Sequence, residues 1–124
     1  MIRVRYRRAG GEHRLTVVGH ADYDHHGKDI VCAGCSGVVY ALLGFLHDHE
    51  GADLRLTASV ESGQTLIHWR GGETAVEAAF QMALIGLAQI ARRYPGHVQV
   101  ETGETHPEER RIVSWETAHC RTST

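Results

Sequence analysis

The chain has 124 residues, of which 42% are hydrophobic, and a formal net charge of -2. This size fits one domain with a single core, and the balanced charge gives no overall field that would attract nucleic acid or an anionic membrane. No apolar run reaches the roughly 20 residues of a membrane span, so we expect no membrane partner. Three cysteines, an odd number, argue against a disulfide framework and fit reduced thiols in a cytoplasmic protein. From the balanced charge we expect no direct contact with nucleic acid.

The N-terminal segment predicts a β-hairpin. Apolar residues alternate with arginines over residues 2–8, which is typical of a strand with one buried face and one solvated, basic face. Residues 9–11 contain two glycines and mark a turn. A second apolar run over residues 15–18 ends near His20. The polar segment 22–28 then predicts an exposed, mobile loop.

A helix is predicted from Ile30 to about His49. Asp29 precedes it as the natural N-cap, because its carboxylate can accept from unpaired backbone N–H groups of the first turn, and Gly51 ends it. Its apolar residues recur at helical spacing: Cys35, Val38, Val39, Leu42, Phe45 and Leu46.

The second half of the chain repeats the order of hairpin and helix. Alternating residues over 54–61 and 65–70 flank Ser62-Gly63 and predict a second hairpin. Residues 76–91 follow helical spacing, and the segment 98–100 predicts a last strand.

The predicted fold is a single α+β domain in the order β-β-α-β-β-α-β, with one sheet and both helices packed on one face. We assign the domain to residues 1–101. The polar C-terminal tail, residues 102–124, is predicted to be either disordered or a short added strand, and Cys120 within it has no evident role.

The stretch GHADYDHHGKDIVCAGCSG, residues 19–37, holds the most reactive side chains. Cys32 falls in the first helical turn, where backbone N–H groups and the helix dipole favour a thiolate. His20 could take the thiol proton, and first-turn N–H groups could hold an oxyanion. Ser36 lies one turn after Cys32 on the same face, where it could orient the thiol or simply pack. The simpler alternatives are an inert buried Cys32, a solvated His20, and an Asp29 that only caps.

A metal site is the rival interpretation of the same stretch. It contains these possible ligands: His20, Asp22, Asp24, His25, His26, Cys32 and Cys35. Cys32 and Cys35 have CxxC spacing, which also suits a redox pair, but no second CxxC pair accompanies it. We therefore expect no metal and no other cofactor, and retain a metal-binding module as the alternative.

Gly19-His20-Ala21, Asp29-Ile30-Val31-Cys32-Ala33 and Ser36 together resemble the ribosomal-processing cysteine protease family called Prp. The resemblance covers roughly residues 1–101 and implies the same order of strands and helices. It departs from the family after Ala33, where Gly34 and Cys35 replace the usual small or aliphatic residues. The tail is also longer and more charged than in the family.

By this resemblance, Cys32 is the nucleophile and His20 its base, with Gly19, Asp29 and Ser36 in supporting positions. The resemblance implies a homodimeric enzyme that removes the N-terminal extension of bacterial large-subunit ribosomal protein twenty-seven. The cut follows a hydrophobic segment that contains phenylalanine, which implies an apolar substrate groove. A ribosome-assembly factor that binds this precursor without cutting it is a further alternative.

Overall fold

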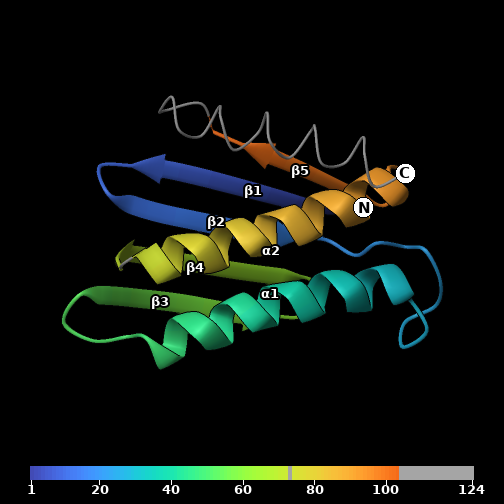
Figure 1. The fold of residues 1–124 in the computed structure, drawn as a ribbon. Coiled ribbons are helices and arrows are strands. Elements are labelled where there is room, and N and C mark those ends of the chain that lie inside the picture. The colour runs from blue at the N-terminus through green and yellow to red at the C-terminus, as the bar shows by residue number, and fades with distance from the viewer. Residues whose placement is uncertain (73, 104–124) are drawn as a thin grey trace.

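The structure, a computed structural model, describes residues 1–72 and 74–103. Its elements follow the chain in the order β-β-α-β-β-α-β (Figure 1). The elements are β1 (Ile2–Ala9), β2 (Glu12–Val18), α1 (Ile30–Asp48), β3 (Leu54–Glu61), β4 (Gln64–Gly71), α2 (Thr74–Arg93) and β5 (Val98–Thr102). The α+β class and the element order predicted from sequence are confirmed.

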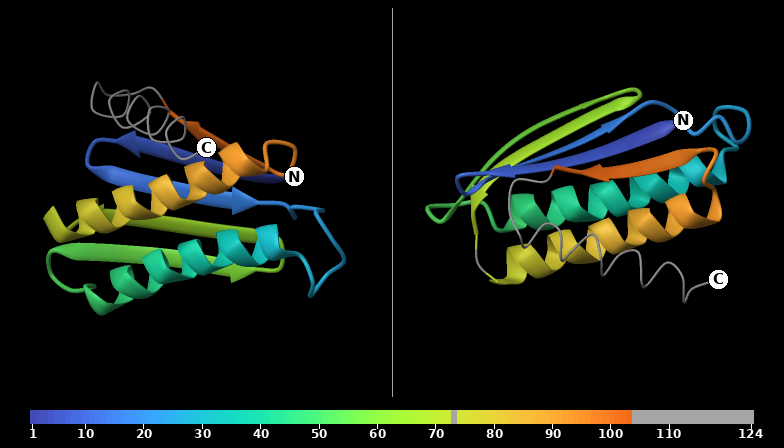
Figure 2. Two further views of the ribbon diagram at one scale, coloured as in Figure 1. Left: turned by 45° about the vertical axis from the view of Figure 1, so that its right-hand side comes forward. Right: turned by 90° about the horizontal axis from the view of Figure 1, so that it is seen from above.

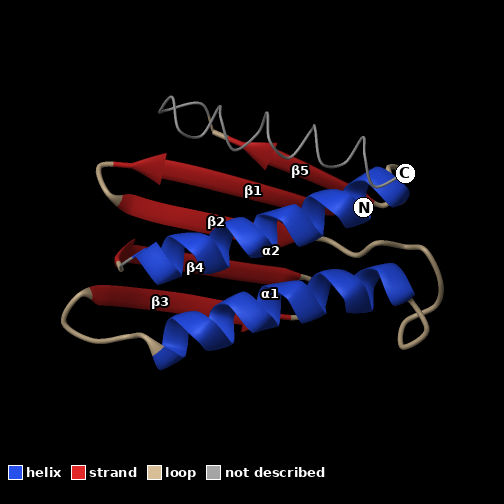
Figure 3. Cartoon of the chain, in the orientation of Figure 1, coloured by secondary structure: helices blue, strands red, loops and turns tan. Residues whose placement is uncertain are grey.

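The five strands form one sheet in the order β3-β4-β2-β1-β5 (Figure 3). The two predicted hairpins are antiparallel, β2 joins them by pairing with β4, and β5 pairs with β1 in parallel. The register places Val18 opposite Gln64, and the N–H of Gly19 donates to the carbonyl of Gly63 at 2.8 Å. The turn of the second hairpin therefore lies beside the segment that leaves β2.

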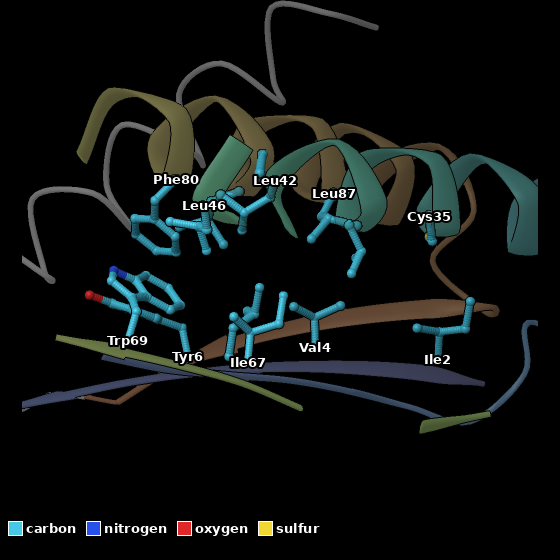
Figure 4. Packing of buried hydrophobic residues seen from close by; sticks show 14 of the residues in the cluster. Ile2, Val4, Tyr6, Cys35, Leu42, Leu46, Ile67, Trp69, Phe80 and Leu87 are labelled. Atoms are coloured by element: carbon cyan, nitrogen blue, oxygen red, sulfur yellow. The ribbon is translucent and has the colours of Figure 1, made fainter. Parts of the chain in front are cut away.

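Both helices cover the same face of the sheet (Figure 2). The alternation predicted for β1 is confirmed, since Ile2, Val4 and Tyr6 are buried and the arginines between them are exposed. Figure 4 shows side chains of the sheet, among them Trp69 and Ile67, pointing toward α1 and α2. Burial of each such large side chain stabilises the fold by about 1.5–3 kcal/mol.

By length and composition alone, both helices are apolar enough to cross a membrane, although the sequence predicts no segment of this kind. Each helix, however, contributes a buried stripe to the core on the sheet. Helices that form the core of a domain have the same apolar composition. Packing on the sheet therefore accounts for their composition.

The predicted boundary between domain and tail lies close to the end of the sheet. β5 continues to Thr102, and the N–H of Gly103 donates to the carbonyl of Tyr6 at 2.7 Å. Residues 104–124, with Cys120, lie outside the described residues, so the predicted state of the tail remains a prediction.

Candidate active site

Asp29 connects the loop to the first turn of α1. Its side chain caps the helix as predicted. The carboxylate accepts backbone hydrogen bonds from Cys32 at 2.9 Å on Oδ1 and from Tyr23 at 2.9 Å and Asp24 at 3.4 Å on Oδ2. Burial alone raises the pKa of the Asp29 carboxyl, but these hydrogen bonds, with one from Val31, outweigh it and lower that pKa below its ordinary value.

This cap overturns one expectation about the first turn. The N–H of Cys32 donates to the Asp29 side chain, and the N–H of Ala33 donates to the Asp29 carbonyl at 3.0 Å. The prediction that first-turn N–H groups hold an oxyanion therefore fails for these two groups. The N–H of Cys32 is engaged by the capping carboxylate, and the N–H of Ala33 by the first backbone hydrogen bond of the helix.

His20 follows β2 and its ring lies against the turn between β3 and β4. Gly63 in that turn has φ +73°, and a Cβ built there would come within 2.7 Å of the His20 Nε2. Gly19 has φ +102°, and a Cβ there would overlap the carbonyl oxygen of Met1. Both glycines therefore fit backbone that a larger residue would not allow.

Two cavities open beside Cys32. One, of about 210 Å³, lies between α1 and the β3–β4 turn, and the other, of about 490 Å³, lies between α1 and loop 22–28. His20, Cys32 and Ser36 line both of them. The structure thus gathers the predicted nucleophile, base and serine at one cleft.

Cys32 and His20 are not joined by a hydrogen bond within the described part of the chain. Cys32 is half-buried and His20 is exposed. Catalytic hydrogen bonds are often long in the absence of substrate and shorten when it binds. The arrangement therefore gives both groups access to one bound molecule.

Cys35 faces the core, as its position three residues after Cys32 predicts, and is 1% exposed. Burial first, and then the charges at Cys32 and Asp29, raise the pKa of the Cys35 thiol to about 11. The two cysteines of the CxxC sequence therefore differ in chemistry. Cys35 is a protonated thiol at neutral pH, whereas Cys32 opens to the cleft.

The loop over residues 22–28 is exposed, as predicted. Its start is held by contacts with the rest of the domain: Tyr23 packs edge-on against Tyr94 with ring centroids 5.3 Å apart, and the Asp22 carboxylate lies 3.5 Å from the N-terminal amine. The predicted mobility of the loop remains a prediction.

The metal-binding alternative receives no support from the geometry. Among residues 1–72 and 74–103, no group of three or more His, Cys, Asp or Glu side chains is arranged to hold a metal ion. His26 lines the cleft together with His20 and Cys32. Some of the predicted ligands therefore lie at one cleft, but they do not form a metal-binding group.

Sequence reasoning missed the second wall of the cleft. Glu61, Gly63 and Thr65 of the second hairpin and Tyr40 of α1 line it. The position of Tyr40 could have been inferred from the sequence, because it lies four residues after Ser36 and eight after Cys32 on one helix face. The position of the hairpin could not, because it depends on the pairing of β4 with β2.

Comparison with known proteins finds a matching family and a related curated protein. Residues 1–99 match the cysteine protease Prp family. The ribosomal processing cysteine protease Prp of Mycoplasma genitalium is 28% identical over 86 residues, which cover 69% of this chain and 84% of that protein.

Solved structures show the same fold. The chain is similar to an essential ribosomal processing protease Prp from S. aureus with a covalently linked product peptide, with a TM-score of 0.69 and 24% identity over 83% of this chain and all of that one. The same S. aureus protease with a substrate peptide gives a TM-score of 0.63 and 23% identity at equal coverage. The match over residues 1–99 shows that this chain belongs to the cysteine protease Prp family.

Proposed function

We propose that this protein is a cysteine endopeptidase that removes the N-terminal extension of large-subunit ribosomal protein twenty-seven. The observation that carries the proposal is the cleft at which Cys32, at the N-terminus of α1, and His20 both lie. The family membership and the ribosomal processing activity in the names of its relatives support it.

In the proposed mechanism, Cys32 attacks the scissile carbonyl carbon as a thiolate, and His20 holds the proton that the thiol has lost. The carbon–nitrogen bond breaks as the His20 imidazolium gives that proton to the departing amine. Water then hydrolyses the thioester, with His20 as the base that takes the proton from water.

The oxyanion needs a donor other than the N–H groups of Cys32 and Ala33, because Asp29 occupies both. The Ser36 hydroxyl lines the cleft one helical turn after Cys32. We assign it to the oxyanion or to the substrate carbonyl. Asp29 and Gly19 position the catalytic residues, the first through the helix cap and the second through its contact with Gly63.

The substrate segment would lie in the cleft between α1 and the β3–β4 turn. Val17, Val39 and Tyr40 give this cleft apolar surface, and Tyr40 is 54% exposed. Such a surface suits the hydrophobic segment that precedes the cut in the family's substrate. The peptide complexes of the S. aureus protease are consistent with a site of this kind.

A cleavage assay on the precursor, with a matched pair of cysteine variants, tests the proposal. Cys32→Ala is expected to abolish cleavage, and His20→Gln to slow it by about 10²–10⁴-fold, the usual contribution of a general base. Cys35→Ala removes only the buried thiol and is expected to retain activity. Cleavage by Cys32→Ala would refute the nucleophile, and loss of activity with a chelator would favour the metal-binding alternative.

The resemblance further implies a homodimer in the cytoplasm that needs no cofactor. We propose these properties together with the reaction. Light scattering on the full chain after size exclusion tests the first: a mass twice that of the 13.7 kDa chain is expected, and a monomeric mass would contradict it.

A further inference from the structure

The face of the sheet opposite the helices is strongly basic. Strand alternation and register place on it one set of residues, which we call the basic face: the arginines Arg3, Arg5, Arg7, Arg14, Arg55 and Arg70, with His68 among them. Figure 2 shows that α1 and α2 lie on the other side of the sheet. The basic face therefore stays open in the described part of the chain.

Two pairs of like charges lie directly opposite one another on this face. Arg7 pairs with Arg14 across β1 and β2, and Arg55 pairs with Arg70 across β3 and β4. Like charges in such cross-strand pairs destabilise a sheet. A bound anion would offset this repulsion.

Carboxylates of the same face neutralise only part of this charge. Glu101 lies 3.2 Å from Arg5, and Glu12 lies 3.8 Å from both Arg70 and His68. Among the described residues, no carboxylate pairs with the four remaining arginines. These are Arg3, Arg7, Arg14 and Arg55.

A cavity of about 210 Å³ lies at the first of the two arginine pairs. Arg7, Arg14 and His68 line it together with Glu12 and His13. Guanidinium groups are the preferred partners of phosphate oxygens. The cavity therefore offers a place for one phosphate group within a wider basic surface.

We propose that the basic face binds the phosphate backbone of RNA. Arginines two residues apart along β1 are spaced by about 6.8 Å, and those on neighbouring strands by about 4.8 Å, so several phosphates can be held at once. The described strands place no Phe, Tyr or Trp on this face to stack bases. Binding is therefore expected to be independent of sequence and sensitive to salt.

RNA suits this face better than an anionic membrane does. Interfacial membrane binding needs large apolar side chains beside the charges, whereas Val18 and Leu66 are the largest apolar side chains among the described residues of this face. The choice of RNA over DNA depends on the proposed function, because a precursor of a ribosomal protein would be met beside ribosomal RNA. The net charge of -2 conceals this surface, since the formal charges are unevenly distributed.

Fluorescence anisotropy with a labelled 20-nucleotide RNA of mixed sequence tests the proposal. Four phosphate contacts predict that affinity falls about 50-fold between 50 and 200 mM salt, because each contact to a single strand adds about 0.7 to the salt exponent. In Arg7→Gln/Arg14→Gln the fall is expected to shrink to about sevenfold. Arg92→Gln/Arg93→Gln removes the same charge from exposed positions of α2 and is expected to bind as the unaltered protein does.

Several results would overturn the proposal: no salt-dependent binding, equal loss of binding in the two double variants, or tighter binding to phosphatidylserine vesicles, to polyglutamate or to DNA of the same sequence. Circular dichroism checks that both variants are folded. Cleavage of a short precursor peptide is expected to be unchanged in Arg7→Gln/Arg14→Gln. RNA binding is expected to persist in Cys32→Ala, so failure of this proposal and failure of the protease proposal give different results.

Discussion

Replacing Asp29 separates its two structural roles. Its Oδ1 caps α1 through the N–H of Cys32, and its Oδ2 accepts from the loop N–H groups of Tyr23 and Asp24. Asp29→Ala removes both functions. Asp29→Asn retains one oxygen for the cap, but turns an N–H donor toward the loop in place of the second oxygen.

The two substitutions are expected to differ in cost. Loss of an N-cap destabilises by about 1 kcal/mol. Loss of the two exposed loop hydrogen bonds, from Tyr23 at 2.9 Å and from Asp24 at 3.4 Å, adds about another 1 kcal/mol in total. Asp29→Ala therefore costs about 2 kcal/mol in the free energy of unfolding and Asp29→Asn about 1 kcal/mol. For a domain of this size these values lower the Tm by about 8 °C and about 4 °C.

Thermal unfolding followed by circular dichroism at pH 7 measures both variants. Because the pKa of Asp29 is lowered in the folded state, its carboxylate contributes fully to stability above the ordinary carboxyl pKa. This stabilisation is lost as pH falls through the lowered, folded-state pKa. The difference in Tm between Asp29→Ala and the unaltered protein should therefore become smaller in acid. Equal Tm values for Asp29→Asn and the unaltered protein would refute the role assigned to Oδ2.

Three further predictions concern single positions. At pH 8 the raised pKa of Cys35 leaves about 0.1% of this thiol as thiolate. Peptide mapping should therefore show that iodoacetamide labels Cys32 before Cys35, and equal labelling of the two would contradict the burial of Cys35. Gly63→Ala, at φ +73° and against the His20 ring, should cost about 1–2 kcal/mol in urea unfolding and slow cleavage, and a variant with normal stability would show that the turn tolerates a side chain. Arg14→Gln removes a like-charge pair and should raise stability by about 0.2–1 kcal/mol, whereas a clear loss would indicate an unrecognised partner of Arg14.

The local parts of the fold were predictable because they depend on neighbouring residues. Alternation between Ile2 and Tyr6 is visible in the sequence, and the cap at Asp29 follows from one side chain and the turn after it. The two hairpins and the two helices therefore had signals of their own. Their boundaries in the structure differ by at most three residues from those predicted, with the largest difference at the start of β2.

The order of the strands had no comparable signal. The pairing of β2 with β4 and of β1 with β5 joins segments far apart in the sequence. Gly63 reaches His20 only through that pairing, so the second wall of the cleft was not predictable. The basic face has the same origin, because the opposition of Arg7 to Arg14 depends on register.

Within the candidate site, the sequence predicted which residues meet, but not all of their hydrogen bonds. Cys32, His20 and Ser36 share the cleft as expected. The cap rule correctly predicted the partner of Asp29, but the same hydrogen bond removes the N–H of Cys32 from the set of oxyanion donors. The helix cap and an oxyanion would compete for this one N–H group, and the sequence alone does not show which of them holds it.

The proposed reaction is measured by intact-mass spectrometry of the host's ribosomal protein twenty-seven precursor, incubated with this protein and, in parallel, with Cys32→Ser. We expect two products from one cut near the N-terminus of the precursor with the unaltered protein, and an uncut precursor with the variant. An uncut precursor in both reactions, with folding confirmed by circular dichroism, would contradict the assigned substrate. The same cut in both at equal rates would contradict Cys32 as the nucleophile.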